Sequence, residues 1–267
     1  MRIIDGTAAL AAVSAAALIA NHEREVASAS GRLAAAAMEA LMNAIDANDG
    51  QTGAHLRRVA SYALTLGDAA SLDEGEMRLI EQVALFHDIG KIHEALFDII
   101  HESRKLSPAE RREILTHPQR GADVLRPFDA FYPDLCDGVL SHHERWDGNG
   151  YPRRLKGHRI PLVARVVSIA DSFDVITHTR RYHRGRSVEV ARDIILAGRG
   201  TQFDPELVDL FAFPPVFEQM MATESRVRHW HAPVPKRTRG QREHHVKEIT
   251  FRWRPESLAT RARRKTA

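Results

Sequence analysis

Apolar residues recur at helical spacing through most of this chain, and that periodicity limits its fold more than any other feature. Leu33, Ala37, Leu41 and Ile45 follow one another at intervals of four, which places them on one face of a helix. Further helices are predicted over the segments 55–69, 73–86, 135–143, 161–177, 187–197 and 203–211. No alternating pattern typical of a strand interrupts them. The sequence therefore predicts an all-α core.

Short signals mark where several of these helices begin and end. Acidic residues from Asp73 onward suit a helix N-terminus. Ser107 is predicted to be an N-cap, with a proline at the first helical position and Glu110 completing a capping box. His117 precedes a proline, which disfavours helical geometry, so we expect it at the end of that helix. A turn-rich break is predicted over residues 46–53.

Composition divides the chain into three predicted regions, over residues 1–35, 36–213 and 214–267. The first is rich in alanine and is predicted to form a short surface or dimer-forming helix. The last is basic: from residue 225 onward it has 13 Lys+Arg against 3 Asp+Glu, so the net charge of +3 hides an acidic body. Such a tail suits nucleic acid or an acidic partner, and a disordered solubilising extension is the alternative.

Cysteine content and hydropathy bear on the cellular compartment. The single cysteine, Cys136, excludes an intramolecular disulfide and is consistent with a reducing cytoplasm. The apolar stretch Thr7–Ala20 is too short to span a bilayer. A secretory signal is the weaker alternative, because no convincing cleavage site follows that stretch. We therefore expect a cytoplasmic protein without a membrane span.

Two short motifs carry most of the chemistry. The first, HDIGK at residues 87–91, places an imidazole beside a carboxylate and adds an ammonium group three residues later. The second, HHERWDGNGYP at residues 142–152, supplies two adjacent imidazoles followed by a glycine-rich turn. Histidine and carboxylate together suit a divalent transition metal, and a neighbouring lysine suits an anionic substrate.

Candidate metal ligands are dispersed along the chain. They are His55, His87, Asp88, His117, His142, His143 and Asp171. The chain has 15 histidines, and a lone histidine on a helix is more commonly a structural group. Local context favours a metal, because His87 and Asp88 end an apolar helix where a buried charge is costly without a partner. From the residues alone, both readings stay open.

Taken together, the motifs resemble those of the HD-GYP family, the branch of HD-type metal phosphohydrolases that degrades cyclic di-GMP in bacteria. The resemblance covers about residues 36–211. The matching segments, in family order, are DGQTGAH at 49–55, HDIGK at 87–91, HP at 117–118, HHERWDGNGYP at 142–152, ADSFD at 170–174 and GTQFDP at 200–205. Several motifs in matching order are far more specific than any one of them.

The resemblance implies an HD-type helical bundle with two divalent metal ions, iron or manganese. One ion would be held by His55, His87, Asp88 and Asp171. The second would share the bridging Asp88 with His117, His142 and His143. Two such ions can clamp the entering and leaving oxygens of a phosphodiester. Asp88 and Lys91 are thus the expected catalytic residues, with Lys91 stabilising charge on the phosphoryl oxygens; an exposed helix-end lysine is the alternative.

The resemblance also assigns residues to the substrate. Gly150, Tyr151 and Pro152 form the GYP loop, which is expected to shape the substrate cleft and to present a surface to partners. Arg180 aligns with a family arginine that contacts substrate phosphate, a role suited to its bidentate fork; a solvated surface arginine is the alternative. Gln51 stands where family members with three metals carry a glutamate ligand, which favours two metals here.

The predicted function is therefore a metal-dependent phosphodiesterase that converts cyclic di-GMP to pGpG, with onward cleavage to GMP left open. Another cyclic dinucleotide, such as cyclic GMP-AMP, is an alternative substrate. A non-catalytic module that binds a nucleotide or a cyclase is the alternative from another class. Diguanylate cyclase (GGDEF) domains are candidate partners of the GYP loop, a homodimer stays open, and nucleic acid is expected only through the basic tail.

Overall fold

The computed structural model describes residues 28–45, 50–92, 107–179 and 184–229. Within these ranges the chain is helical and has no strand, which confirms the predicted all-α class. Residues 42–232 form one compact unit, and the candidate site lies inside it. Residues 1–27 of the predicted alanine-rich N-terminal region, Arg180, and the tail from residue 230 onward lie outside the described residues.

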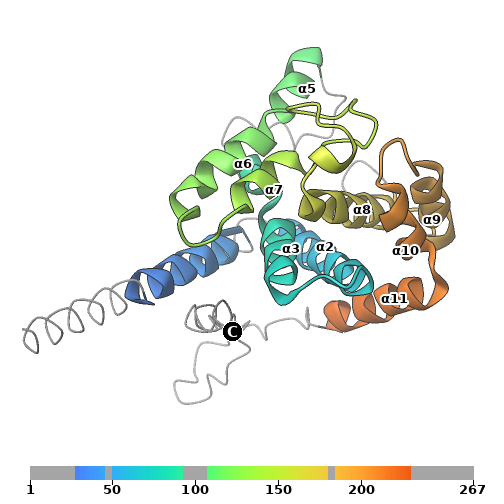
Figure 1. The fold of residues 1–267 in the computed structure, drawn as a ribbon, viewed down its shortest axis with the longest axis horizontal. Helices are drawn as coiled ribbons and strands as arrows, with labels where there is room; N and C mark the ends of the chain where they lie inside the picture. The colour runs from blue at the N-terminus through green and yellow to red at the C-terminus, as the bar shows by residue number, and fades with distance from the viewer. Residues whose placement is uncertain (1–27, 46–49, 93–106, 180–183, 230–267) are drawn as a thin grey trace, which may run out of the picture. The chain divides into compact units, whose positions relative to one another are not determined.

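Figure 1 shows the order of the helices along the chain. The first described helix covers residues 28–45. The α-helices that follow are α2 (Gly50–Ala69), α3 (Glu74–Phe86), α5 (Pro108–Ile114), α6 (His117–Leu125), α7 (Leu135–Ser141), α8 (Leu162–Thr177), α9 (Val188–Ala197), α10 (Pro205–Ala212) and α11 (Pro214–His229). Short 3-10 helices are η1 (Ile89–Ile92), η2 (Arg126–Phe128) and η3 (Gly157–Arg159). Among the described helices, none combines the length and hydrophobicity needed to cross a membrane.

Side-chain caps set the starts of several helices. Asp73 accepts hydrogen bonds from the backbone N–H groups at the start of α3, and the Glu76 side chain accepts from the Asp73 backbone in return. Ser107 and Glu110 form the same reciprocal pair at the start of α5. These bonds satisfy N–H groups that have no intrahelical acceptor. The predicted capping box at Ser107 is confirmed, and α3 begins with the acidic residues expected of it.

Some helix boundaries differ from the prediction. His117 is the first residue of α6 and not the end of α5, which stops at Ile114. Pro118 is tolerated there because the first turn of a helix has N–H groups without partners. The turn-rich break predicted over residues 46–53 is wrong over residues 50–53, which already belong to α2, and its residues 46–49 lie outside the described part of the chain. A further helix, α11, follows α10 and buries Met220 completely.

The core that positions the site lies where α2 packs against α3, α8 and α11 (Figure 1). Tyr62 on α2, Phe173 on α8 and Phe211 on α10 have no solvent exposure. The Phe173 ring meets those of Tyr62 and Phe211 edge-on, at centroid distances of 5.3 and 5.5 Å. Edge-to-face contacts of this kind add to the stability gained from burial. Because α2 and α8 are packed together in this way, their polar residues are held at a fixed separation.

A close contact between two glycines joins η1 to α6. A Cβ atom on Gly90 would overlap the carbonyl oxygen of His117 and lie 2.6 Å from the backbone nitrogen of Gly121. A Cβ on Gly121 would in turn lie 3.3 Å from the backbone nitrogen of Gly90. Only glycine lets the two backbones approach this closely. The contact brings the segment that carries Asp88 and Lys91 against the start of α6.

Replacing Gly90 with alanine is expected to lower the free energy of unfolding by about 3 kcal/mol, because the added methyl group meets backbone that has no room to yield. Urea denaturation followed by circular dichroism measures the change. Gly50→Ala is the matched control, since a Cβ there meets nothing within 4 Å. Equal stability of the two variants would contradict the tight contact.

Candidate metal centre

Ligand-type side chains converge in two groups, and each group has its ligand atoms within 4.8 Å of one another. The first group is His55, His87 and Asp171. The second group is Asp88, His117, His142 and His143. These are the seven dispersed residues singled out in the sequence, and α2, α3, α6, α7 and α8 carry them or end beside them. Such a donor set, rich in imidazole with carboxylates, suits a divalent transition metal.

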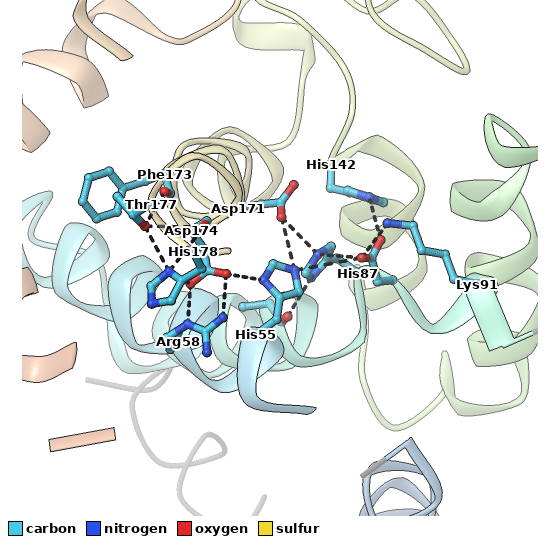
Figure 2. Close-up of polar contacts among 12 residues, drawn as sticks. His55, Arg58, His87, Lys91, His142, Asp171, Phe173, Asp174, Thr177 and His178 are labelled. Atoms are coloured by element: carbon cyan, nitrogen blue, oxygen red, sulfur yellow. Dashed lines mark hydrogen bonds and ion pairs between the residues drawn. The ribbon is translucent and has the colours of Figure 1, made fainter. Parts of the chain in front are cut away.

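Asp88 lies between the two groups, and its two oxygens face different ways. Oδ2 is 3.5 Å from His87 Nε2 and 4.0 Å from His55 Nε2, on the side of the first group. Oδ1 is 3.3 Å from His117 Nε2 and 4.0 Å from His142 Nε2, on the side of the second. Figure 2 shows His87, His142 and Lys91, which lie around this part of the site. The geometry is that expected of a carboxylate shared by two neighbouring cations.

Three histidines are oriented by backbone carbonyls at helix ends. His87, His117 and His142 donate from Nδ1 to the carbonyl oxygen three residues earlier, at 2.8, 2.7 and 2.6 Å. Those carbonyls lie in the last turns of α3, α5 and α7, where no intrahelical N–H reaches them. A carbonyl can only accept, so Nδ1 carries the proton and Nε2 keeps its lone pair in the neutral ring. Each Nε2 is therefore ready to act as a ligand.

The electrostatics of the site differ between its imidazoles. Burial would lower the pKa of His87, but Asp88 and Asp171 more than offset it and raise that pKa. Burial lowers the pKa of His143 to about 3, with a contribution from the neighbouring His117. Burial, together with His143 and His87, holds the pKa of His142 well below its ordinary value. Burial alone would raise the pKa of Asp88, but Lys91 and His87 more than offset it and hold that pKa well below the ordinary value. His142, His143 and Asp88 can therefore bind a cation without first losing protons.

Two buried atoms at the centre have no hydrogen-bond partner. They are Nε2 of His87 and Oδ1 of Asp88. Leaving a buried polar atom unsatisfied costs about 1–3 kcal/mol, so native structures rarely do it without a reason. Both atoms face the middle of the site, where a divalent cation would satisfy them. The residues present therefore fit the two metal ions that the sequence predicts.

Lys91 lies beside the shared carboxylate. Its Nζ donates a hydrogen bond to Asp88 Oδ2 at 2.7 Å, and about a quarter of the side chain (26%) is exposed. The short helix η1 places the two residues on the same side, three positions apart. An ammonium group in this place is close enough to meet an anion that approaches the centre.

The segment after the paired histidines is packed tightly onto them. The ring of Tyr151 stacks on that of His143 at a centroid distance of 4.9 Å. Gly150 allows this approach, since a Cβ there would lie 2.6 Å from the backbone of Glu144. The Glu144 carboxylate is 3% exposed and accepts from the backbone N–H groups of Arg153 and Leu155, at 2.7 and 3.0 Å. The predicted GYP loop is thus fixed directly to the paired histidines.

The GTQFDP segment fixes the same loop from the other side. Backbone N–H groups of Trp146 and Asp147 donate to the carbonyls of Gln202 and Thr201, at 3.1 and 2.8 Å. Asp204 caps α10 through the backbone of residue 206. The segment therefore acts as a scaffold for the loop, and it supplies none of the ligand atoms of the two groups.

Sequence reasoning missed two carboxylates that support the site, Glu144 and Asp174. Asp174 is fully buried and accepts hydrogen bonds from His55, Arg58 and His178, drawn in Figure 2. Burial would raise its pKa, but the hydrogen bonds from His178, His55 and Arg58 hold that pKa well below the ordinary value. Both residues lie within the quoted motifs, but the motifs do not indicate which groups these carboxylates contact.

A protein-family model described as an HD domain matches residues 39–207. The 3′3′-cGAMP-specific phosphodiesterase 2 of Vibrio cholerae is 36% identical over 172 residues, which are 64% of this chain and 33% of that relative. The cyclic di-GMP phosphodiesterase response regulator RpfG of Xanthomonas campestris is 37% identical over 171 residues, which are 63% of this chain and 45% of that relative. The chain thus spans less than half the length of these two relatives.

Among solved structures, the cyclic GMP-AMP specific phosphodiesterase V-cGAP3 of V. cholerae gives a TM-score of 0.53 at 25% sequence identity. The match covers 72% of this chain and 52% of that one. Like that structure, this chain is a bundle of helices, which agrees with the architecture predicted from the motifs.

Proposed function

This chain belongs to the HD domain family, and we propose that it is a metal-dependent phosphodiesterase of the HD-GYP branch that hydrolyses cyclic di-GMP. The family match and the structural likeness confirm an HD domain and the predicted helical fold. One observation carries the proposal: two groups of ligand-type side chains meet at Asp88, with Lys91 beside it. That arrangement has the parts needed to bind and cut a phosphodiester.

We assign a divalent ion to each group of ligands. His55, His87 and Asp171 would hold one, His117, His142 and His143 the other, and Asp88 both. Iron or manganese suits these nitrogen and oxygen donors. When bound, the pair of ions supplies Lewis acidity and an activated water at neutral pH. Asp88 would provide one oxygen to each ion. Lys91 stabilises the negative charge that develops on the phosphoryl oxygens.

We choose cyclic di-GMP because of the motifs. The names of the relatives make 3′3′-cGAMP the alternative substrate. RpfG is named for cyclic di-GMP, whereas the V. cholerae relative is named for 3′3′-cGAMP. Both molecules present phosphodiesters to the centre, and the two differ in one base. The metal ligands and Lys91 therefore serve either substrate equally well, and discrimination belongs to residues that meet the bases.

The substrate and partner residues follow from the same proposal. Gly150, Tyr151 and Pro152 shape one wall of the substrate site, since the loop is fixed against His143. Arg180, outside the described residues, is assigned to a substrate phosphate. A GGDEF domain at the GYP loop, a homodimer and a cytoplasmic location stay predictions from the sequence.

The test is anaerobic purification, metal analysis, and separate incubation with cyclic di-GMP and 3′3′-cGAMP, with the products separated by chromatography. We expect about two iron or manganese ions per chain and release of pGpG, with activity lost after chelation and restored by Mn²⁺. Cleavage of 3′3′-cGAMP alone would overturn the assigned substrate. Tight binding of either nucleotide without turnover in the metal-loaded protein would favour the non-catalytic module. A folded protein that takes up no metal would refute the proposal.

A further inference from the structure

The buried carboxylate of Asp174 contacts three polar side chains, those of His55, Arg58 and His178. Its Oδ2 accepts from His55 Nδ1 at 2.6 Å and from the Arg58 guanidinium at 3.0 Å. Its Oδ1 accepts from Arg58 Nε at 2.6 Å and lies 3.1 Å from His178 Nδ1. The carboxylate has no solvent exposure, and Figure 2 shows it joining these three side chains. Its position on α8, three residues after Asp171, places both carboxylates on the same helix face.

His55 needs such a partner because of where it lies in its helix. The other oriented histidines, His87, His117 and His142, use free carbonyls at helix ends. His55 lies inside α2, where the carbonyls of the preceding turn already accept intrahelical bonds. Its Nδ1 must therefore find an acceptor on another element, and Asp174 on α8 supplies it. The opposite nitrogen, Nε2, lies 3.3 Å from Asp171 Oδ1.

We propose that Asp174 is a positioning residue of the metal centre, which fixes the tautomer and direction of His55 so that Nε2 faces the first ligand group. The inference rests on the proposed metal-dependent function. A carboxylate behind a ligating histidine orients the ring and makes it a better donor, and losing it costs about 10- to 100-fold in metal affinity. Arg58 contacts both oxygens of Asp174, and so keeps the carboxylate turned toward His55.

The inference predicts an effect at one metal site only. In Asp174→Asn, which keeps the size of the side chain, we expect one of two Mn²⁺ affinities to weaken by about 10- to 100-fold, while the other changes less than about twofold. Titration of the metal-free full chain with Mn²⁺, followed by electron paramagnetic resonance of the free ion, measures both affinities. Circular dichroism and thermal denaturation establish that the variant is folded.

Asp204→Asn is the matched control. Asp204 is 2% exposed and accepts from the Arg165 guanidinium at 2.5 Å, so it is a second buried carboxylate paired with an arginine. It belongs to neither ligand group. We expect this variant to lose stability and to keep both Mn²⁺ affinities. Equal weakening in the two variants would mean that Asp174 acts through the fold alone, and would overturn the inference.

The ¹⁵N chemical shifts of the His55 ring give a readout that does not depend on activity. In the metal-free wild-type chain we expect Nδ1 to carry a proton, because the Asp174 carboxylate can only accept from that nitrogen. In Asp174→Asn, whose amide can also donate, we expect the Nε2–H form to increase. Unchanged tautomer and unchanged affinities would refute the role of Asp174 while leaving the proposed function intact. If the wild-type chain itself binds no Mn²⁺, the proposed function fails, and the inference fails with it.

Discussion

Asp88→Asn is expected to lower the rate of cyclic di-GMP hydrolysis by about 10³-fold, because a metal centre supplies several kcal/mol of transition-state stabilisation. The two oxygens of Asp88 face different ligand groups, with Oδ2 3.5 Å from His87 Nε2 and Oδ1 3.3 Å from His117 Nε2. An amide cannot supply the negative charge that two neighbouring cations share. We therefore expect the variant to bind fewer metal ions as well as to turn over slowly.

The measurements for Asp88→Asn are steady-state hydrolysis and metal content, with the helical signal recorded to confirm folding. Asp123→Asn is the control, since that carboxylate is exposed on α6 and pairs with Gln119 and Arg126, which lie on or beside its own helix. Its activity should match that of the wild-type chain. Full metal content in Asp88→Asn with hydrolysis within about tenfold of the wild type, a difference of about 1.4 kcal/mol, would contradict the shared-ligand role.

Lys91→Met is expected to lower kcat by about 10²- to 10³-fold, the usual cost of removing one group that stabilises charge in a transition state. Methionine keeps the length of the side chain and removes its charge. The metal ligands stay in place, so metal content should remain near that of the wild type. Lys91→Arg should recover part of the rate, since its guanidinium still carries a positive charge, though with a different geometry.

The decisive comparison for Lys91 is between kcat and metal content. In the structure the ammonium group lies 2.7 Å from Asp88 Oδ2, so it has two candidate roles, at the substrate and at the carboxylate. Loss of kcat with metal retained supports contact with the substrate. Loss of metal to the extent seen in Asp88→Asn would instead mean that Lys91 serves to hold Asp88, and would overturn the assigned role.

Features whose partners lie close together in the sequence could be predicted, whereas contacts between residues far apart in the sequence could not. The capping box of Ser107 and Glu110 was predictable because both partners lie within one helical turn. His117 was misplaced because a proline is compatible with two positions, after a helix or in its first turn. The seven candidate ligands were assigned through family motifs, since spacing alone does not reveal which distant histidines converge.

The contacts made by Asp174 and Glu144 could not be predicted from the sequence. His55 and Asp174 meet across 119 residues of sequence, and their partnership follows from the packing of α2 on α8. Glu144 lies in the HHERWDGNGYP motif, but its carboxylate accepts hydrogen bonds from backbone N–H groups. Every residue except proline has such a group, so the sequence does not indicate these partners. The role of Arg180 stays a prediction, because it lies outside the described residues.

The histidines at helix ends also bear on how such a site could change in evolution. His87, His117 and His142 each satisfy the last carbonyls of a helix with one nitrogen while the other faces the centre. A lineage that gave up catalysis would still need these rings, or other donors, to finish its helices, since each such hydrogen bond is worth about 1 kcal/mol. His143 has no such bond among the described contacts, and its ring packs against those of His142, His117 and Tyr151. Drift toward an inactive descendant would therefore begin more easily at His143 than at its neighbour.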